Sequence, residues 1–229
     1  MFRRALILAL LFAVPLAADK KTGAPLAKLP LQTAEVVGLT LPKVAQACTN
    51  YAVAVAVETI LRTQKVPLDQ HFWVQKANGG ELCIDPMPDF DRLSRAINGT
   101  YTLDDTRKVT LSTEVIPGAP TIPDDVIAPL KQGIPLLVFW KSRAYLLQGA
   151  TYDEYIFPNG QRMYQLRELK MIDPLASSKQ REVSFVNGTD DPADIAAFIR
   201  VAVTPVNPQP WIRQTPWQTD TNWIPKKRQ

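Results

Sequence analysis

The chain has few histidines, few cysteines and a small net charge. It has one histidine, two cysteines and a net charge of +4 at neutral pH. Arg3 and Arg4 near the start and a basic segment at the end account for all of that positive charge, so the residues between them are close to neutral. A neutral domain offers no basic face to nucleic acid, and we expect no nucleic-acid partner.

No hydrophobic run is long enough to cross a membrane, which takes about 20 apolar residues. The apolar run near the start, residues 5–16, is shorter; it follows a basic pair and precedes the small residues Ala17 and Ala18. This pattern predicts an export signal over residues 1–18. The protein is therefore expected to be exported, to the periplasm or the extracellular space, with a membrane contact only if the signal stays uncleaved.

Acidic residues occur in small groups, but none has the ligand spacing of a known metal site. We expect these carboxylates to cap helices and form turns instead. Neither a metal nor another cofactor is predicted. The residues concerned are Asp85, Asp89, Asp91, Asp104, Asp105, Asp190 and Asp191.

With 229 residues, 46% of them hydrophobic and 21% charged, the chain has the profile of one globular domain with a core. Prolines at positions 25, 30 and 42 predict an extended N-terminal segment over residues 19–43. The compact domain is predicted at residues 44–204, starting near Val44. A tail rich in proline and tryptophan follows at residues 205–229.

The hydrophobic period changes along the domain from helical to strand-like. Helices are predicted over residues 52–63, with Thr49 or Asn50 as the cap, over 69–77, capped by Asp69, and over 88–98. Strands are predicted over residues 134–140, 144–150, 152–157, 163–172, 182–186 and 201–203, with a short helix over 191–199. Asn159-Gly160 predicts a tight hairpin turn. Helices followed by an antiparallel sheet make an α+β fold.

Gln46, Tyr51, Ala52 and Ile60-Leu61 stand in an order that resembles the nucleophile region of papain-like cysteine peptidases, in particular their bacterial leader-peptidase-like branch. In that branch a glutamine is followed after five residues by the catalytic cysteine, small apolar residues and Ile-Leu. The resemblance puts Gln46 at the oxyanion-binding position and Ala52 at the position of the cysteine. It implies that the catalytic sulfur is missing.

The second half of the domain resembles the same branch, in which Gly-x-Pro, an apolar strand, Gly-His, a second apolar strand ending in Gly, and Asp-Pro follow one another. The corresponding residues are Gly133-Ile134-Pro135, Ser142-Arg143, Gly149 and Asp173-Pro174. Arg143 falls at the position of the catalytic histidine and Asp173 at that of the acid that orients it.

A guanidinium keeps its proton near neutral pH and cannot act as a general base. The resemblance therefore implies a papain-like fold, with N-terminal helices packed on a C-terminal sheet, that has become a pseudoenzyme. Such a protein would bind an extended peptide or a protein partner in its former cleft. An arginine beside a carboxylate forms a charge-assisted bond, so we expect Arg143 to pair with Asp173.

Two other functions stay open. The protein could be an active thiol peptidase or amidase that uses Cys48 as nucleophile and His71 as base, although a papain-type base comes from a strand far downstream and His71 falls in a predicted helix. A partly buried structural imidazole is the simpler role for His71. The third possibility is an envelope interaction protein without a cleft function, built on an unrelated α+β domain.

Cys48 and Cys83 are an even number of cysteines in a chain with an export signal, which predicts a disulfide between them. The bridge would tie the start of the first helix to the loop after the second. The alternative is a pair of buried free thiols.

Trp211, Trp217 and Trp223 recur every six residues in the tail. In a strand or a polyproline-type helix this spacing projects all three rings to one side. They are predicted either to pack back over the domain or to dock a partner or a glycan.

Overall fold

The computed structural model describes residues 27–45, 48–78, 89–120, 123–175 and 181–206. Within these ranges the fold is α+β, as predicted, with four α-helices and one nine-stranded antiparallel sheet. The helices are α1 (Thr49–Thr63), α2 (Gln70–Asn78), α3 (Phe90–Ile97) and α4 (Asp124–Lys131). The strands are β1 (Ala27–Lys28), β2 (Gln32–Glu35), β3 (Gly99–Thr102), β4 (Lys108–Pro117), β5 (Leu136–Trp140), β6 (Arg143–Ile156), β7 (Arg162–Ile172), β8 (Glu182–Val186) and β9 (Ile195–Pro205).

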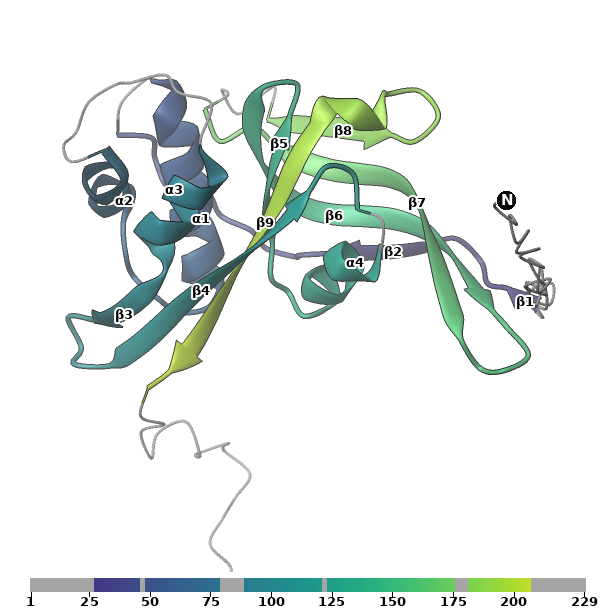
Figure 1. Cartoon of the computed structure of the whole chain (residues 1–229), viewed down its shortest axis with the longest axis horizontal. Coiled ribbons are helices and arrows are strands. Elements are labelled where there is room, and N and C mark those ends of the chain that lie inside the picture. The colour runs from purple at the N-terminus through teal and green to yellow at the C-terminus, as the bar shows by residue number, and fades with distance from the viewer. Residues whose placement is uncertain (1–26, 46–47, 79–88, 121–122, 176–180, 207–229) are drawn as a thin grey trace, which may run out of the picture.

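The strand order is β3-β4-β9-β5-β6-β7-β8, and β1 and β2 pair with β6. Strand β6 is the longest strand of the sheet. Along one edge its first residues pair with β5, and its later residues pair with β2 and then β1. Figure 1 shows α1, α2 and α3 gathered at one end of the molecule, while the β6–β7 hairpin extends toward the other. The sheet begins before Val44, the predicted start of the compact domain.

Two hydrophobic cores lie on opposite faces of β5, because successive side chains of a strand point to opposite sides. The first core contains Leu137 and Phe139 together with buried residues of α1, α2 and α3. The second core contains Leu136, Val138 and Trp140 together with buried residues of α4, β8 and β9. Helices α1, α2 and α3 thus cover one face of this part of the sheet, and α4 covers the other face.

The three predicted N-terminal helices are present, and their N-terminal capping residues can be compared with the predicted ones. The residue that precedes α1 is Cys48, whose side chain makes no capping bond, so the predicted cap at Thr49 or Asn50 is wrong. Asp69 does cap α2, accepting a hydrogen bond from the Phe72 N–H at 2.9 Å. Asp89 caps α3, as its oxygen accepts from two backbone N–H groups of the first turn.

The predicted helix over residues 191–199 is wrong. Only Pro192–Asp194 forms a single 3₁₀ turn, and the chain then enters β9 at Ile195. Strand β9 lies between β4 and β5 and buries Ala197, Phe198 and Ile199 completely. Pairing on both edges with strands distant in sequence outweighs the helix propensity of this short segment.

The sequence analysis did not predict two strands and one helix in the middle of the chain. Strands β3 and β4 follow α3, so the first half is not purely helical, and α4 precedes β5. The predicted strands 144–150 and 152–157 are one strand, β6, which continues through bulges near Gly149 and Tyr152. The Asn159-Gly160 turn is confirmed: the Gly160 N–H donates to the Phe157 carbonyl at 2.9 Å, and Gly160 has φ +79°.

Candidate functional site

The turn between β5 and β6 positions the site. Trp140 and Arg143 face each other in the pairing of the two strands, so only Lys141 and Ser142 form the turn. Both have positive φ values, 49° and 59°. Two successive residues with positive φ match a type I′ turn, which suits the twist of a hairpin but is more usually made by Asn-Gly. Arg143 is thereby fixed as the first residue of β6.

Arg143 and Asp173 form an ion pair, as predicted from the sequence. Arg143 Nη2 lies 2.6 Å from Asp173 Oδ2, and the Asp173 side chain is only 8% exposed. The other oxygen, Oδ1, accepts a hydrogen bond from the Leu175 N–H at 2.9 Å. A buried carboxylate needs such partners on its oxygens, so Arg143 and the backbone of Leu175 together account for the stable placement of Asp173.

Aromatic rings lie under the two cations of this region. The guanidinium carbon of Arg143 is 5.7 Å from the centre of the Tyr145 ring, and Lys141 Nζ is 4.1 Å from that of Trp140. Lys141 Nζ also lies 3.1 Å from Asp190 Oδ1. Burial raises the pKa of Tyr145, while the charge of Arg143 opposes that rise. Tyr145 is therefore a neutral phenol at physiological pH.

Arg143 shares a face of β6 with Tyr145, because residues two apart in a strand point the same way. Tyr145 belongs to the second core. Ala52 is 5% exposed and lies in α1, whose buried neighbours Tyr51 and Ala54 belong to the first core. The structure thus brings Arg143 and Asp173 together but directs Arg143 to the face of the hairpin opposite α1. Gln46, the expected oxyanion residue, lies outside the described residues.

Cys48, rather than Ala52, stands where α1 begins. A helix N-terminus is the place where the pKa of a thiol is lowered and the thiol becomes reactive, so Cys48 has the position that a nucleophile would need. It is not a free thiol, however. Cys83 lies outside the described residues, and the Cys48–Cys83 disulfide stays a prediction.

His71 lies in α2, as the sequence predicted, and not on a strand of the sheet. Its ring meets the Tyr51 ring edge-on with the centroids 6.1 Å apart. The residue is exposed, so the expectation of a partly buried imidazole is wrong.

A buried polar pair that the sequence analysis did not single out holds the chain just before α1. Glu58 is 2% exposed, pairs with Arg62 at 2.5 Å, and accepts hydrogen bonds from the backbone and the side chain of Gln70 at 3.1 and 3.2 Å. The Gln70 amide in turn accepts from the Ala45 N–H and donates to the Lys43 carbonyl, both at 2.9 Å. A lone glutamate inside the apolar run 52–61 was the signal that could have revealed it.

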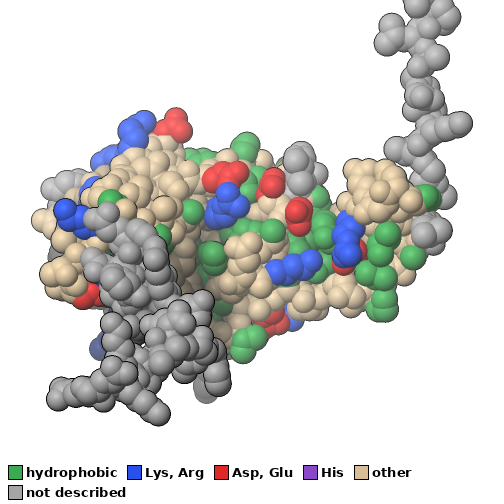
Figure 2. Space-filling view, turned by 90° about the horizontal axis from the view of Figure 1, so that it is seen from below, with side chains coloured by type: hydrophobic (Ala, Val, Ile, Leu, Met, Phe, Trp, Pro, Cys, Tyr) green, Lys and Arg blue, Asp and Glu red, His purple; other side chains and the backbone are tan. Residues whose placement is uncertain are grey.

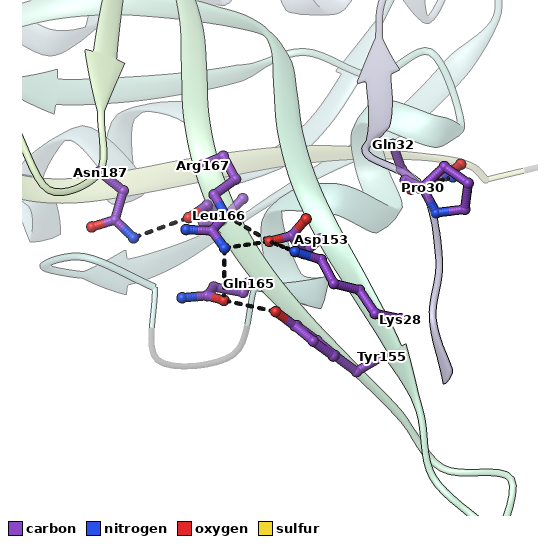
Figure 3. A network of polar contacts seen from close by, with 9 residues as sticks. All are labelled: Lys28, Pro30, Gln32, Asp153, Tyr155, Gln165, Leu166, Arg167 and Asn187. Carbon is purple, nitrogen blue, oxygen red and sulfur yellow. Dashed lines mark hydrogen bonds and ion pairs between the residues drawn. The ribbon is translucent and has the colours of Figure 1, made fainter. Parts of the chain in front are cut away.

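A second polar network ties β1 to the β6–β7 hairpin (Figure 3). Asp153 is 3% exposed; it lies 3.1 Å from Lys28 Nζ and accepts from Arg167 Nε at 2.7 Å. The hydrogen bond from Arg167, more than that from Lys28, lowers the pKa of Asp153. Gln165 contacts both Arg167 and Tyr155 at 3.3 Å.

Figure 2 shows basic and acidic side chains interspersed on the face seen from below, without a patch of one sign.

Among the described residues, no three metal-binding side chains come together, and no helix has the length and apolar character to span a membrane. Trp211, Trp217 and Trp223 lie beyond the part of the chain that the structure describes. No protein-family model matches the sequence, and no curated protein is significantly similar to it.

Proposed function

We propose that this protein is an exported, catalytically inactive homologue of papain-like peptidases that binds an extended peptide or a protein partner. The observation that carries the proposal is the Arg143–Asp173 ion pair. Two positions 30 residues apart, selected because they resemble the histidine and the acid of a catalytic triad, are in direct contact at 2.6 Å.

The chemistry of the candidate residues supports binding rather than catalysis. Arg143, which resembles the histidine of a triad by its place in the sequence, cannot accept a proton near neutral pH and so could not serve as a base. Its pairing with Asp173 lies on the face of the hairpin opposite α1. Ala52 has no nucleophilic atom, and Cys48 is not a free thiol. Peptide binding needs none of these functions, since it depends on hydrogen-bond donors and acceptors and on buried apolar contacts.

The test is to immobilise the full mature chain and incubate it with a pool of randomised decapeptides. We expect the column to retain a subset of peptides and mass spectrometry to find them intact. The matched control is the same column unfolded in urea, which should retain no defined subset. Failure of the folded protein to retain any peptide would remove the proposed function.

A second candidate, an active thiol peptidase or amidase, is favoured by one observation: Cys48 stands at the start of α1. The same peptide pool distinguishes it. New peptide fragments that disappear after treatment with iodoacetamide would establish this activity and refute the inactive assignment. Mild reduction before the assay extends the test to a protein whose Cys48 is released from its bond.

A further inference from the structure

The guanidinium of Arg143 is fixed along one edge and largely exposed elsewhere. Its contact to Asp173 uses one nitrogen, and 58% of the Arg143 side chain remains exposed against 8% for its partner. A guanidinium has five N–H donors in a rigid planar fork. The bond to Asp173 and the contact with Tyr145 use only part of this set, so donors remain on the exposed part of a side chain whose position is already determined.

A second cation, Lys141, lies in the turn itself. Lys141 is 49% exposed, is anchored by Asp190 at 3.1 Å, and lies over the Trp140 ring. The two cations are separated only by Ser142, in a turn that is fixed by strand pairing on both sides. These side chains are therefore already ordered in the free protein, so a ligand that binds them causes a smaller loss of conformational entropy.

Trp140 adds an unexplained donor to the same turn. Its indole Nε1 is buried and has no hydrogen-bond partner among the described residues, and Trp140 is the direct pairing neighbour of Arg143. Buried N–H groups without partners are rare in folded proteins and need an explanation. Among the described residues, this end of the β5–β6 hairpin thus combines two exposed cations with one buried indole N–H. Each cation is paired with a carboxylate, Asp173 or Asp190, whose other oxygen accepts a backbone N–H.

We propose, as a deepening of the peptide-binding function, that this end of the hairpin binds a carboxylate group of the partner peptide, with Arg143 as the main contact. A carboxylate presents two oxygens and a negative charge to the planar fork of arginine, whereas a peptide carbonyl presents one neutral oxygen. Asp173 and Asp190 offset the charges of Arg143 and Lys141, so the site has no excess positive charge that would favour a doubly charged phosphate over a singly charged carboxylate. The carboxylate belongs either to the C-terminus of the peptide or to an Asp or Glu side chain.

Three randomised decapeptide pools separate these sources on the immobilised full chain. The first has a free C-terminal carboxylate and no Asp or Glu, the second an amidated C-terminus and one Asp, and the third an amidated C-terminus and no acidic residue. We expect the first or the second pool to be retained about tenfold more than the third, the effect of one charge-assisted contact. The pool that shows the excess identifies the source of the carboxylate.

Variants assign the effect to Arg143. Arg143→Gln should bring the retention ratio close to one, and Arg143→Lys, which keeps the charge but loses the fork, should reduce it. The matched control is Arg200→Gln, because Arg200 is also a half-exposed arginine paired with a carboxylate, Glu114, on β9 and β4. Arg200→Gln should leave the ratio unchanged.

The outcomes separate the two proposals. Equal retention of all three pools by the unmodified protein refutes carboxylate binding and leaves peptide binding intact. An excess that persists in a folded Arg143→Gln protein refutes the role of Arg143. Retention of none of the pools removes the proposed function itself.

Discussion

Replacing Gln70 by methionine, which has a similar volume but no amide group, should strongly destabilise the protein. The side-chain amide of Gln70 makes three hydrogen bonds, to Ala45, Lys43 and Glu58, at 2.9, 2.9 and 3.2 Å. Gln70 is 5% exposed and Glu58 2%, so water cannot replace these bonds in the folded state. A net value of roughly 0.5–1.5 kcal/mol for each bond, with the larger values for a charged acceptor, gives a loss of about 2–4 kcal/mol in the free energy of unfolding.

Urea denaturation followed by circular dichroism measures this loss as a lower midpoint with an unchanged slope. Gln165→Met is the matched control, since Gln165 is exposed and its contacts, at 3.3 Å, are long; its effect should stay within about 0.5 kcal/mol. A loss below about 1 kcal/mol for Gln70→Met would show that the amide does not hold the segment before α1, and the account of this buried pair would then be wrong.

Three further predictions follow from the turn, the buried aspartate and the cysteines. Ser142→Gly relieves a positive φ of 59° and should raise the free energy of unfolding by about 0.5–1 kcal/mol, seen as a higher melting temperature; a lower one would contradict the turn geometry. Asp153 has a lowered pKa in the folded protein, so its contribution is complete above the unfolded value of 3.8 and is lost as the pH falls through the folded pKa; the stability difference between the protein and its Asp153→Asn variant should therefore shrink below about pH 4, and a pH-independent difference would refute it. Replacing Cys48 and Cys83 together by serine should lower the free energy of unfolding by about 3–4 kcal/mol, and non-reducing peptide mapping that recovers both as free thiols would refute the predicted bridge.

Signals within a few residues were enough to predict several elements correctly. The long apolar run after Cys48 predicted α1, Asp69 predicted the cap of α2, and Asn159-Gly160 predicted the turn between β6 and β7. The predicted strand 182–186 has the bounds of β8. In each of these cases backbone conformation depends on local hydrogen bonds, caps and turn residues, which a single sequence displays.

Elements that depend on distant partners could not be predicted in this way. Residues 195–199 have the composition of a short helix, and only the pairing of β9 with β4 and β5 makes them a strand. The same is true of the buried pair Glu58–Gln70, whose members lie in different helices.

For the candidate site, the residue types and their order along the sequence were enough to predict that Arg143 and Asp173 would pair, and the ion pair confirms this. Only the tertiary structure decided that α1 starts directly after Cys48 and that Arg143 lies over Tyr145 on the face of the hairpin opposite that helix. The physical reason is the two-residue alternation of a strand: a shift of one position moves a side chain to the other face, and register is set by partners far away in the chain.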